Sequence, residues 1–98
     1  MRYWPAALTY GNWGGPGWSG GKFVSDPKLV DWSVDCIDEM DKLFKQHDWD
    51  VQHGMGRAAH KKLAIALEKL DPPAHWGRWP RAYRLDAIGI FTVLGAWA

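Results

Sequence analysis

The stretch that decides the fold is Asp38-Glu39-Met40-Asp41-Lys42-Leu43-Phe44-Lys45-Gln46-His47-Asp48. Within it and on either side, apolar residues recur three and four positions apart, which is the spacing of one buried face of a helix; they are Val34, Ile37, Met40, Leu43, Phe44 and Val51. Asp31 or Ser33 can act as the N-cap. We therefore predict a helix over about residues 34–52, with His47 on its buried stripe and Asp48 at the edge of that stripe.

Two more helices are expected after this one. The break His53-Gly54-Met55-Gly56 is followed by a second helix over residues 57–70, whose shared apolar face consists of Ala59, Leu63, Ala66, Leu67 and Leu70. Asp71-Pro72-Pro73 ends it. The short connection predicts that the two helices are antiparallel neighbours. A third helix is predicted after Pro80, with Tyr83, Leu85, Ile88, Phe91, Val93, Leu94 and Trp97 as its apolar residues, so the expected fold class is all-α.

A glycine-rich segment precedes the helices: Tyr10-Gly11-Asn12-Trp13-Gly14-Gly15-Pro16-Gly17-Trp18-Ser19-Gly20-Gly21. This many glycines exclude a helix or a central strand and predict a loop whose backbone approaches something closely. A flexible linker is the alternative interpretation, but linkers rarely carry large apolar side chains such as Trp13 and Trp18. Residues 22–32 are predicted to be a linker punctuated by Pro27.

The composition indicates one small domain covering residues 1–98. Hydrophobic residues make up 47% of the chain and charged residues 23%, which is typical of a globular protein. A net charge of +1 without a basic stripe gives no support for nucleic-acid binding. We expect the chain to be a monomer. Cys36 is the only cysteine, so no internal disulfide can form and Cys36 is expected to be a small buried apolar residue.

The unusual feature of the composition is its eight tryptophans. A chain this short cannot bury all of them, and tryptophan favours the headgroup level of a membrane, where its ring is apolar and its N–H is hydrated. The first residues lack the pattern of a signal peptide. The uncharged end, Ala87 to Ala98, is too short to span a bilayer, which takes about 20 residues. We therefore expect contact with a membrane surface and make no prediction of compartment.

His47 and Asp48 are the candidate chemical groups. A single histidine on an apolar face is usually a core residue, but a carboxylate beside it is costly to bury unless it is paired or binds a metal. A glycine loop can offer backbone carbonyl oxygens, which together with one carboxylate suit the hard Ca²⁺ ion. Patterns for a phosphate-binding loop, an EF-hand, a zinc site and a G-x-S-x-G nucleophile are all absent from the sequence.

Together the two segments resemble the secreted phospholipase A2 superfamily. Residues 10–17 resemble its calcium loop, and residues 38–48 resemble its active-site helix, usually written D-x-L-D-x-C-C-x-x-H-D; the helix matches at Asp38, Glu39, Asp41, His47 and Asp48. The resemblance covers about residues 10–67 and is closest to disulfide-free relatives in viral and bacterial proteins. It implies a small phospholipase A2-like domain with two antiparallel helices, a calcium loop over residues 10–21 and a C-terminal helix.

The resemblance also implies roles for individual residues. The carbonyl oxygens of Trp13, Gly15 and Gly17 and the carboxylate of Asp48 would bind Ca²⁺. His47 would take a proton from a water molecule that attacks the sn-2 ester of a glycerophospholipid. The Gly15 N–H and the ion would stabilise the oxyanion. No acyl-enzyme would form, so no serine or cysteine nucleophile is needed.

The sequence departs from this family in its cysteines, which are replaced by Leu43 and Phe44 on the helix and by Asn12 and Gly14 in the loop. The loop would then depend on packing and on calcium for its order. The gap between Gly17 and Asp38 is also longer than usual, and Val51 stands near the position of a family tyrosine.

A further departure concerns the aspartate with which the family orients its histidine. The matching stretch here is Ala59-His60-Lys61-Lys62-Leu63. His60 shares the buried face of its helix with Leu63 and Leu67, so we expect it to reach His47. A neutral imidazole can accept the His47 N–H but cannot stabilise the cation that forms during catalysis. His60 is therefore either an orienting residue or a tolerated replacement in a weakened enzyme, whereas Asp50 lies on the wrong side of its helix to substitute.

The expected function is calcium-dependent hydrolysis of glycerophospholipids at a membrane surface, with Trp18 and Trp97 as membrane contacts. A non-catalytic module that binds calcium and lipid, and has lost turnover, is the main alternative. A helical interaction protein that carries the motif by coincidence is the third.

Overall fold

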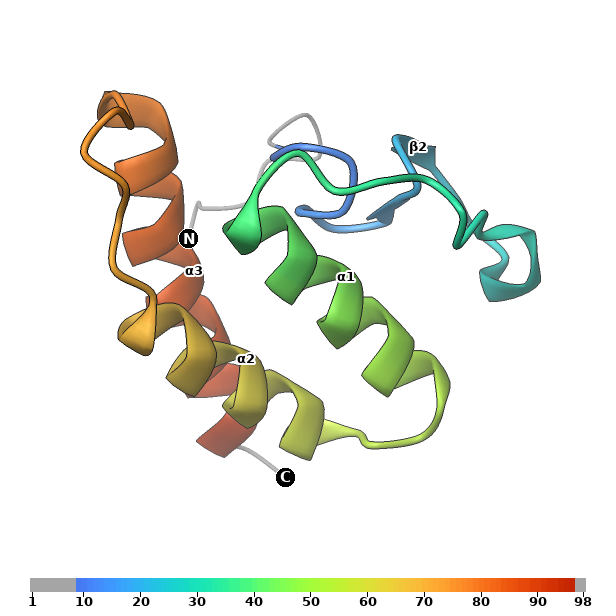
Figure 1. Ribbon diagram of the computed structural model, residues 1–98. Coiled ribbons are helices and arrows are strands. Elements are labelled where there is room, and N and C mark those ends of the chain that lie inside the picture. Colours follow the sequence, from blue (N-terminus) through green and yellow to red (C-terminus); the bar gives the residue numbers. More distant parts are fainter. Residues whose placement is uncertain (1–8, 97–98) are drawn as a thin grey trace.

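The computed structural model describes residues 9–96, and it is mostly helical with one very small sheet (Figure 1). The elements in chain order are β1 (Trp18–Ser19), β2 (Lys22–Phe23), a 3-10 helix η1 (Pro27–Leu29), α1 (Glu39–Gln52), α2 (Arg57–Lys69) and α3 (Arg78–Ala96). The predicted helical class is thus right in outline, although β1 and β2 were not foreseen. Among the described residues no helix is both long enough and apolar enough to cross a membrane.

The first long helix begins later than the sequence pattern predicts. Residue 34 was the expected start, but α1 begins at Glu39 because Asp38 is the N-cap, with extended backbone and a side chain that accepts the Asp41 N–H at 2.8 Å. Asp31 instead closes a local turn by accepting the backbone and hydroxyl hydrogens of Ser33. The stripe prediction is consequently wrong at its start, where Ile37 is 61% exposed.

The second and third helices pack against each other more closely than either packs against α1. α2 spans nearly the predicted residues and runs antiparallel to α1 (Figure 1). α3 begins at Arg78 and accommodates Pro80 in its first turn, where the missing N–H costs nothing. The Arg84 side chain ties α3 to the end of α2 by donating to the carbonyl oxygens of Leu67 and Glu68. Two apolar residues predicted for the buried face of α3, Leu85 and Val93, are exposed instead.

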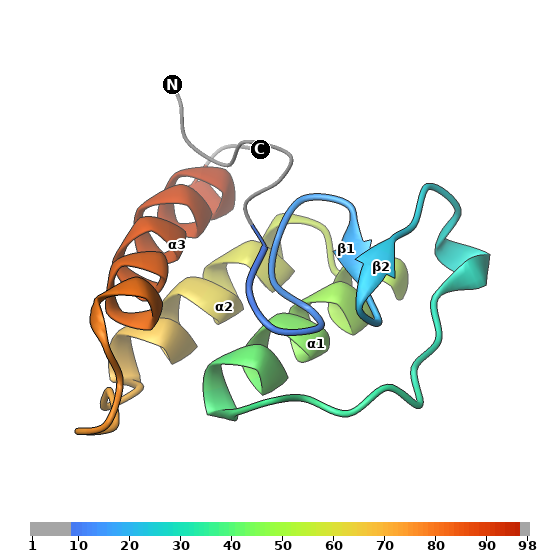
Figure 2. The ribbon, with the colours of Figure 1, turned by 90° about the horizontal axis from the view of Figure 1, so that it is seen from above.

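The glycine-rich segment is folded onto α1 and is not a flexible linker. Tyr10 and Gly14 exchange two backbone hydrogen bonds, and residues 18–23 form the hairpin of β1 and β2. Seen from above, this segment lies over α1 (Figure 2). Trp13 is buried to 1% exposure, and it joins a core whose other members are Tyr10, Met40, Phe44, Leu63, Leu67, Trp76, Tyr83 and Ala87. The predicted linker over residues 22–32 in fact contains β2 and η1.

Candidate active site

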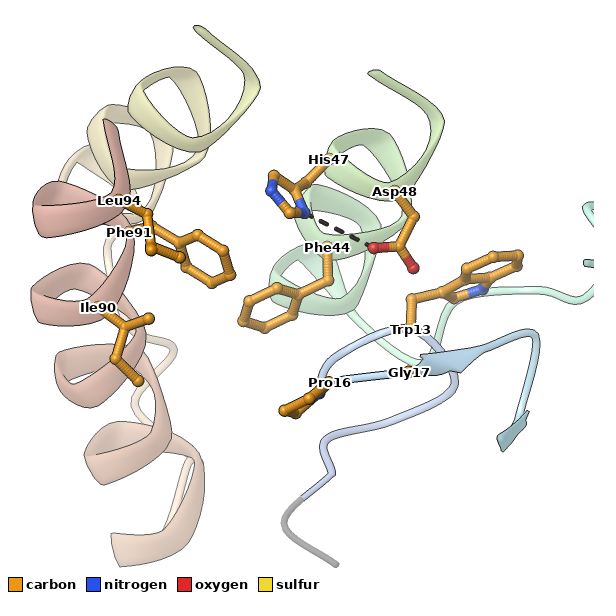
Figure 3. Close-up of a pocket in the computed structure, with 10 residues that line it drawn as sticks. Trp13, Pro16, Gly17, Phe44, His47, Asp48, Ile90, Phe91 and Leu94 are labelled. Carbon is orange, nitrogen blue, oxygen red and sulfur yellow. Dashed lines mark ion pairs between the residues drawn. The ribbon is translucent and has the colours of Figure 1, made fainter. Parts of the chain in front are cut away.

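His47 and Asp48 point from α1 into a cavity of about 300 Å³ that the glycine loop and α3 close (Figure 3). All four residues predicted to bind calcium, Trp13, Gly15, Gly17 and Asp48, line this cavity together with His47. The opposite wall comes from α3 and is apolar, with Ile90, Phe91 and Leu94, while Pro16 of the loop and Phe44 of α1 add further apolar surface. The cavity therefore has a polar end on α1 and a hydrocarbon wall on α3.

The two imidazole nitrogens of His47 have different neighbours. Nε2 lies 2.8 Å from Nδ1 of His60 on α2, so the contact expected from the sequence is present. Nδ1 lies 3.6 Å from Oδ1 of Asp48, and the edge of the His47 ring packs against Phe91 at a centroid distance of 4.7 Å. If Nε2 donates its hydrogen to His60, then Nδ1 carries a lone pair on the side of Asp48 and can accept a proton there.

Asp48 is a carboxylate that the fold keeps largely out of water. Its burial raises its pKa above the ordinary value, although the proximity of His47 and the hydrogen bond from Ser19 act in the opposite direction. The Ser19 hydroxyl donates to Oδ2 of Asp48 at 2.7 Å. A raised pKa means that the ionised form is under-stabilised by the protein alone. A bound cation would supply the missing stabilisation.

The pKa of His60 is shifted in the opposite direction. Burial lowers its pKa below the ordinary value of 6.5, and the proximity of His47 lowers it further. The reason is that a second positive charge beside a protonated His47 is unfavourable. His60 is accordingly a neutral partner of His47 at neutral pH.

The oxygen atoms of the glycine loop are donors of the chemical kind that a calcium ion takes. Gly15 and Gly17 both have positive φ, at 128° and 68°, which a side chain would disfavour. Their carbonyl oxygens accept the backbone hydrogens of Trp18 and Val24, which fixes the carbonyls and leaves each oxygen a second lone pair. Together with the Asp48 carboxylate these are hard oxygen donors, as Ca²⁺ requires. Within residues 9–96 there is no group of three or more His, Cys, Asp or Glu side chains able to hold a metal, so a site here would depend on backbone oxygens.

A second, more open cavity of about 510 Å³ also reaches His47 and Asp48. Its lining includes polar groups from four segments, namely Ser19, Ser25, Gln52 and His60, together with the ring of Trp32. His47 and Asp48 therefore line both cavities, and the walls of each are mainly apolar.

Of the two predicted membrane contacts, Trp18 and Trp97, the structure describes only Trp18. Trp18 is half-buried, and its indole N–H donates to the carbonyl oxygen of Gly11 at 3.0 Å. Its ring packs edge-on against Phe23, which is 58% exposed and which the sequence analysis did not single out. Trp97 lies outside the described residues.

Other outcomes concern residues that the sequence did or did not indicate. Asp50 is buried and bonds to Gln46 and Lys62, and although it lines a small cavity together with His47, its carboxylate makes no hydrogen bond to that ring within the described part of the chain. Ser19 was missed because no pattern marks a serine within a glycine loop as a partner of a carboxylate. The apolar wall on α3 was recognised only as a helix face, since its approach to α1 is a long-range contact. Comparisons with protein-family models, curated proteins and solved structures find no match to this chain.

Proposed function

We propose that the protein hydrolyses the sn-2 ester of glycerophospholipids at a membrane surface in a calcium-dependent reaction, with His47 as the general base. One observation carries the proposal. His47 turns Nε2 to His60 and Nδ1 to the side of Asp48, in a cavity that the glycine loop also lines. A base oriented in this way is what water activation beside an ion site requires.

The reaction follows from these positions. Nδ1 of His47 accepts a proton from a water molecule while the water oxygen attacks the ester carbonyl carbon. The carbonyl oxygen becomes an oxyanion, to which the Gly15 N–H is the candidate donor. The tetrahedral species then expels the alcohol oxygen, which takes the proton back from His47, and a fatty acid and a lysophospholipid remain.

A calcium ion bound to the carbonyl oxygens of Trp13, Gly15 and Gly17 and to the Asp48 carboxylate would act as a Lewis acid for the negative charge that develops. The contribution of the chain is to hold those oxygens on one side of His47. The Ser19 hydroxyl orients the Asp48 carboxylate by donating to Oδ2.

The cavity walls support a lipid substrate. Phe44, Ile90, Phe91 and Leu94 form an apolar surface directly beside the base, where an acyl chain would leave water. The second cavity also reaches His47, and the polar side chains on its mainly apolar lining, such as Ser19 and Gln52, could bond to the glycerol and headgroup portion. The choice of the sn-2 position rests on the family resemblance.

A specific observation favours the alternative, a calcium- and lipid-binding module without turnover. The partner of Nε2 is an imidazole and not a carboxylate. When His47 takes a proton, no negative charge stands behind it to stabilise the imidazolium. Binding of ion and lipid could therefore outlast catalysis.

The deciding experiment is fatty-acid release from mixed phospholipid vesicles, in calcium and in excess EDTA, for the wild type and His47→Gln. We expect release that stops with the chelator and with the mutation, while His47→Gln still binds calcium. Calcium binding without any release would favour the non-catalytic module. Release that continues in EDTA would refute the calcium-dependent reaction.

A further inference from the structure

The second acidic residue of α1 that faces the glycine loop is Asp41, and its side chain is fully buried at 0% exposure. Its carboxylate accepts three backbone hydrogens, from Asn12 at 3.0 Å, from Trp13 at 2.8 Å and from Ile37 at 3.0 Å. No ion pair with Asp41 occurs among the described residues. The negative charge is therefore held by backbone amides from two separate segments.

Burying this carboxylate costs free energy that an apolar side chain would not cost, so Asp41 must contribute something that an apolar residue cannot. Removing a carboxylate from water costs several kcal/mol, and only well-placed hydrogen bonds offset this. A core residue such as leucine would fill the space, but it could not hold the Asn12 and Trp13 amides. The carboxylate thus fixes the backbone that leads directly into the candidate calcium ligands.

The close approach of Gly11 supports the same interpretation. A Cβ atom at Gly11 would lie 2.6 Å from Cγ of Asp41, and the backbone there has a φ of 56°. The loop is therefore pressed onto this carboxylate so tightly that only glycine fits. Tight contact over three consecutive residues, 11–13, defines one conformation of the loop.

We propose that Asp41 is the positioning residue of the calcium loop and sets its affinity for the ion without touching substrate. This inference rests on the proposed function. Asp41 holds the peptide of Trp13, whose carbonyl oxygen is a candidate ligand, and through Trp13 it orients the chain towards Gly15.

Asp41→Asn is the sharpest test, because asparagine keeps the shape but turns an N–H₂ group towards backbone donors. Calcium binding is measured by tryptophan fluorescence and by the calcium-dependent rise in melting temperature, which reports affinity even in a less stable variant. We expect about 10–100-fold weaker calcium binding, as is typical when a group that orients a ligand is lost.

Asp50→Asn is the matched control. Asp50 is the other buried aspartate of α1, but its partners are Gln46 and Lys62 and not the loop. It should lose stability and keep its calcium affinity. An equal loss of affinity in both variants would mean that any damage to α1 weakens the ion site, and the proposal would fail.

A glycine pair tests the same contact without changing a charge, and it serves if Asp41→Asn does not fold. Gly11→Ala should weaken calcium binding because its methyl group meets the Asp41 carboxylate. Gly54→Ala carries a similar positive φ of 86° but has open space around it, so it should lose stability only. Unchanged calcium affinity in Gly11→Ala or in folded Asp41→Asn would overturn the inference. A wild type that binds no calcium would instead refute the proposed function itself.

Discussion

Replacing His60 by aspartate should make the proposed enzyme faster. His60 contacts Nε2 of His47 through its own Nδ1, at 2.8 Å. That atom is three bonds from Cα, and so is each carboxylate oxygen of an aspartate. An oxygen of the new side chain can therefore occupy the place of Nδ1, accept the same hydrogen and preserve the tautomer of His47. What changes is the charge behind the base.

The size of the effect follows from Coulomb's law. Two opposite unit charges about 4 Å apart attract by about 4 kcal/mol at an effective dielectric constant near 20. The His47 side chain is only 11% exposed, but His60 is half-buried, so water screens part of this attraction. A remaining stabilisation of about 1.4–2.7 kcal/mol for the transition state, where His47 carries a full charge, corresponds to roughly tenfold to a hundredfold in kcat.

His60→Asn provides the control, because it offers an uncharged oxygen in the same position and should retain a rate near that of the wild type. Fatty-acid release at saturating calcium is compared for the three proteins, with melting temperatures measured alongside, because a buried aspartate also costs stability. The acid limb of the pH–rate profile should change from two coupled titrations to one in His60→Asp. If a folded His60→Asp protein is no faster than His60→Asn, the charge behind Nε2 does not govern the rate and the mechanism is wrong.

Three further predictions concern titration and the membrane. The pKa of His60 is lowered on folding from 6.5, so the unfolded chain binds more protons below that pH. The free energy of unfolding, measured in a series of urea titrations over pH 5–7, should therefore fall as the pH drops through 6.5, and His60→Asn should flatten this dependence. The pKa of Asp48 is raised on folding, so its ionised form opposes folding above that pKa. At pH 7 without calcium, Asp48→Asn should melt at a higher temperature than the wild type, and calcium should no longer raise its melting temperature. Phe23→Ala should weaken vesicle binding by about tenfold at unchanged melting temperature, since it removes exposed apolar surface. Trp18→Ala should lower both the vesicle affinity and the melting temperature, because its indole also bonds to Gly11. If the two variants lose vesicle affinity and melting temperature equally, the assignment of Phe23 to the interface is wrong.

The bounds of a helix could be predicted where only one local sequence feature marked its start or its end. The break at residues 53–56 and the Pro72-Pro73 pair bound α2 to within a residue of the prediction. The start of α1 was not predictable from periodicity, because Val34 and Ile37 match a helical spacing although they precede the helix. The capping side chain of Asp38 decided the start, and a cap is a matter of one hydrogen bond that several nearby acids could have made.

Some contacts of the candidate site could likewise be predicted from the sequence, and others could not. The proximity of His60 to His47 followed from shared helical faces on two antiparallel helices, and the structure confirms it. The Ser19 hydroxyl on Asp48, the apolar wall from Ile90 to Leu94 and the second cavity were not predictable. Each depends on how a segment without periodicity, or a helix distant in the sequence, approaches α1. Sequence spacing carries no information on such approaches.

Contacts in the structure show how the glycine loop is held on α1 although Cys36 is the only cysteine of the chain. Phe44 stands where the resembled family has a cysteine, and its ring packs against Tyr10 and Tyr83. A Cβ atom at Gly14 would lie 2.9 Å from that ring, so the loop rests directly on Phe44. Apolar packing on Phe44 and the hydrogen bonds to the Asp41 carboxylate thus hold the glycine loop on α1, as a disulfide bond would. Because Phe44 also lines the cavity beside His47, the contact that orders the glycine loop is continuous with the wall proposed to receive the acyl chain. Ordering of the loop and binding of the lipid should therefore stabilise each other.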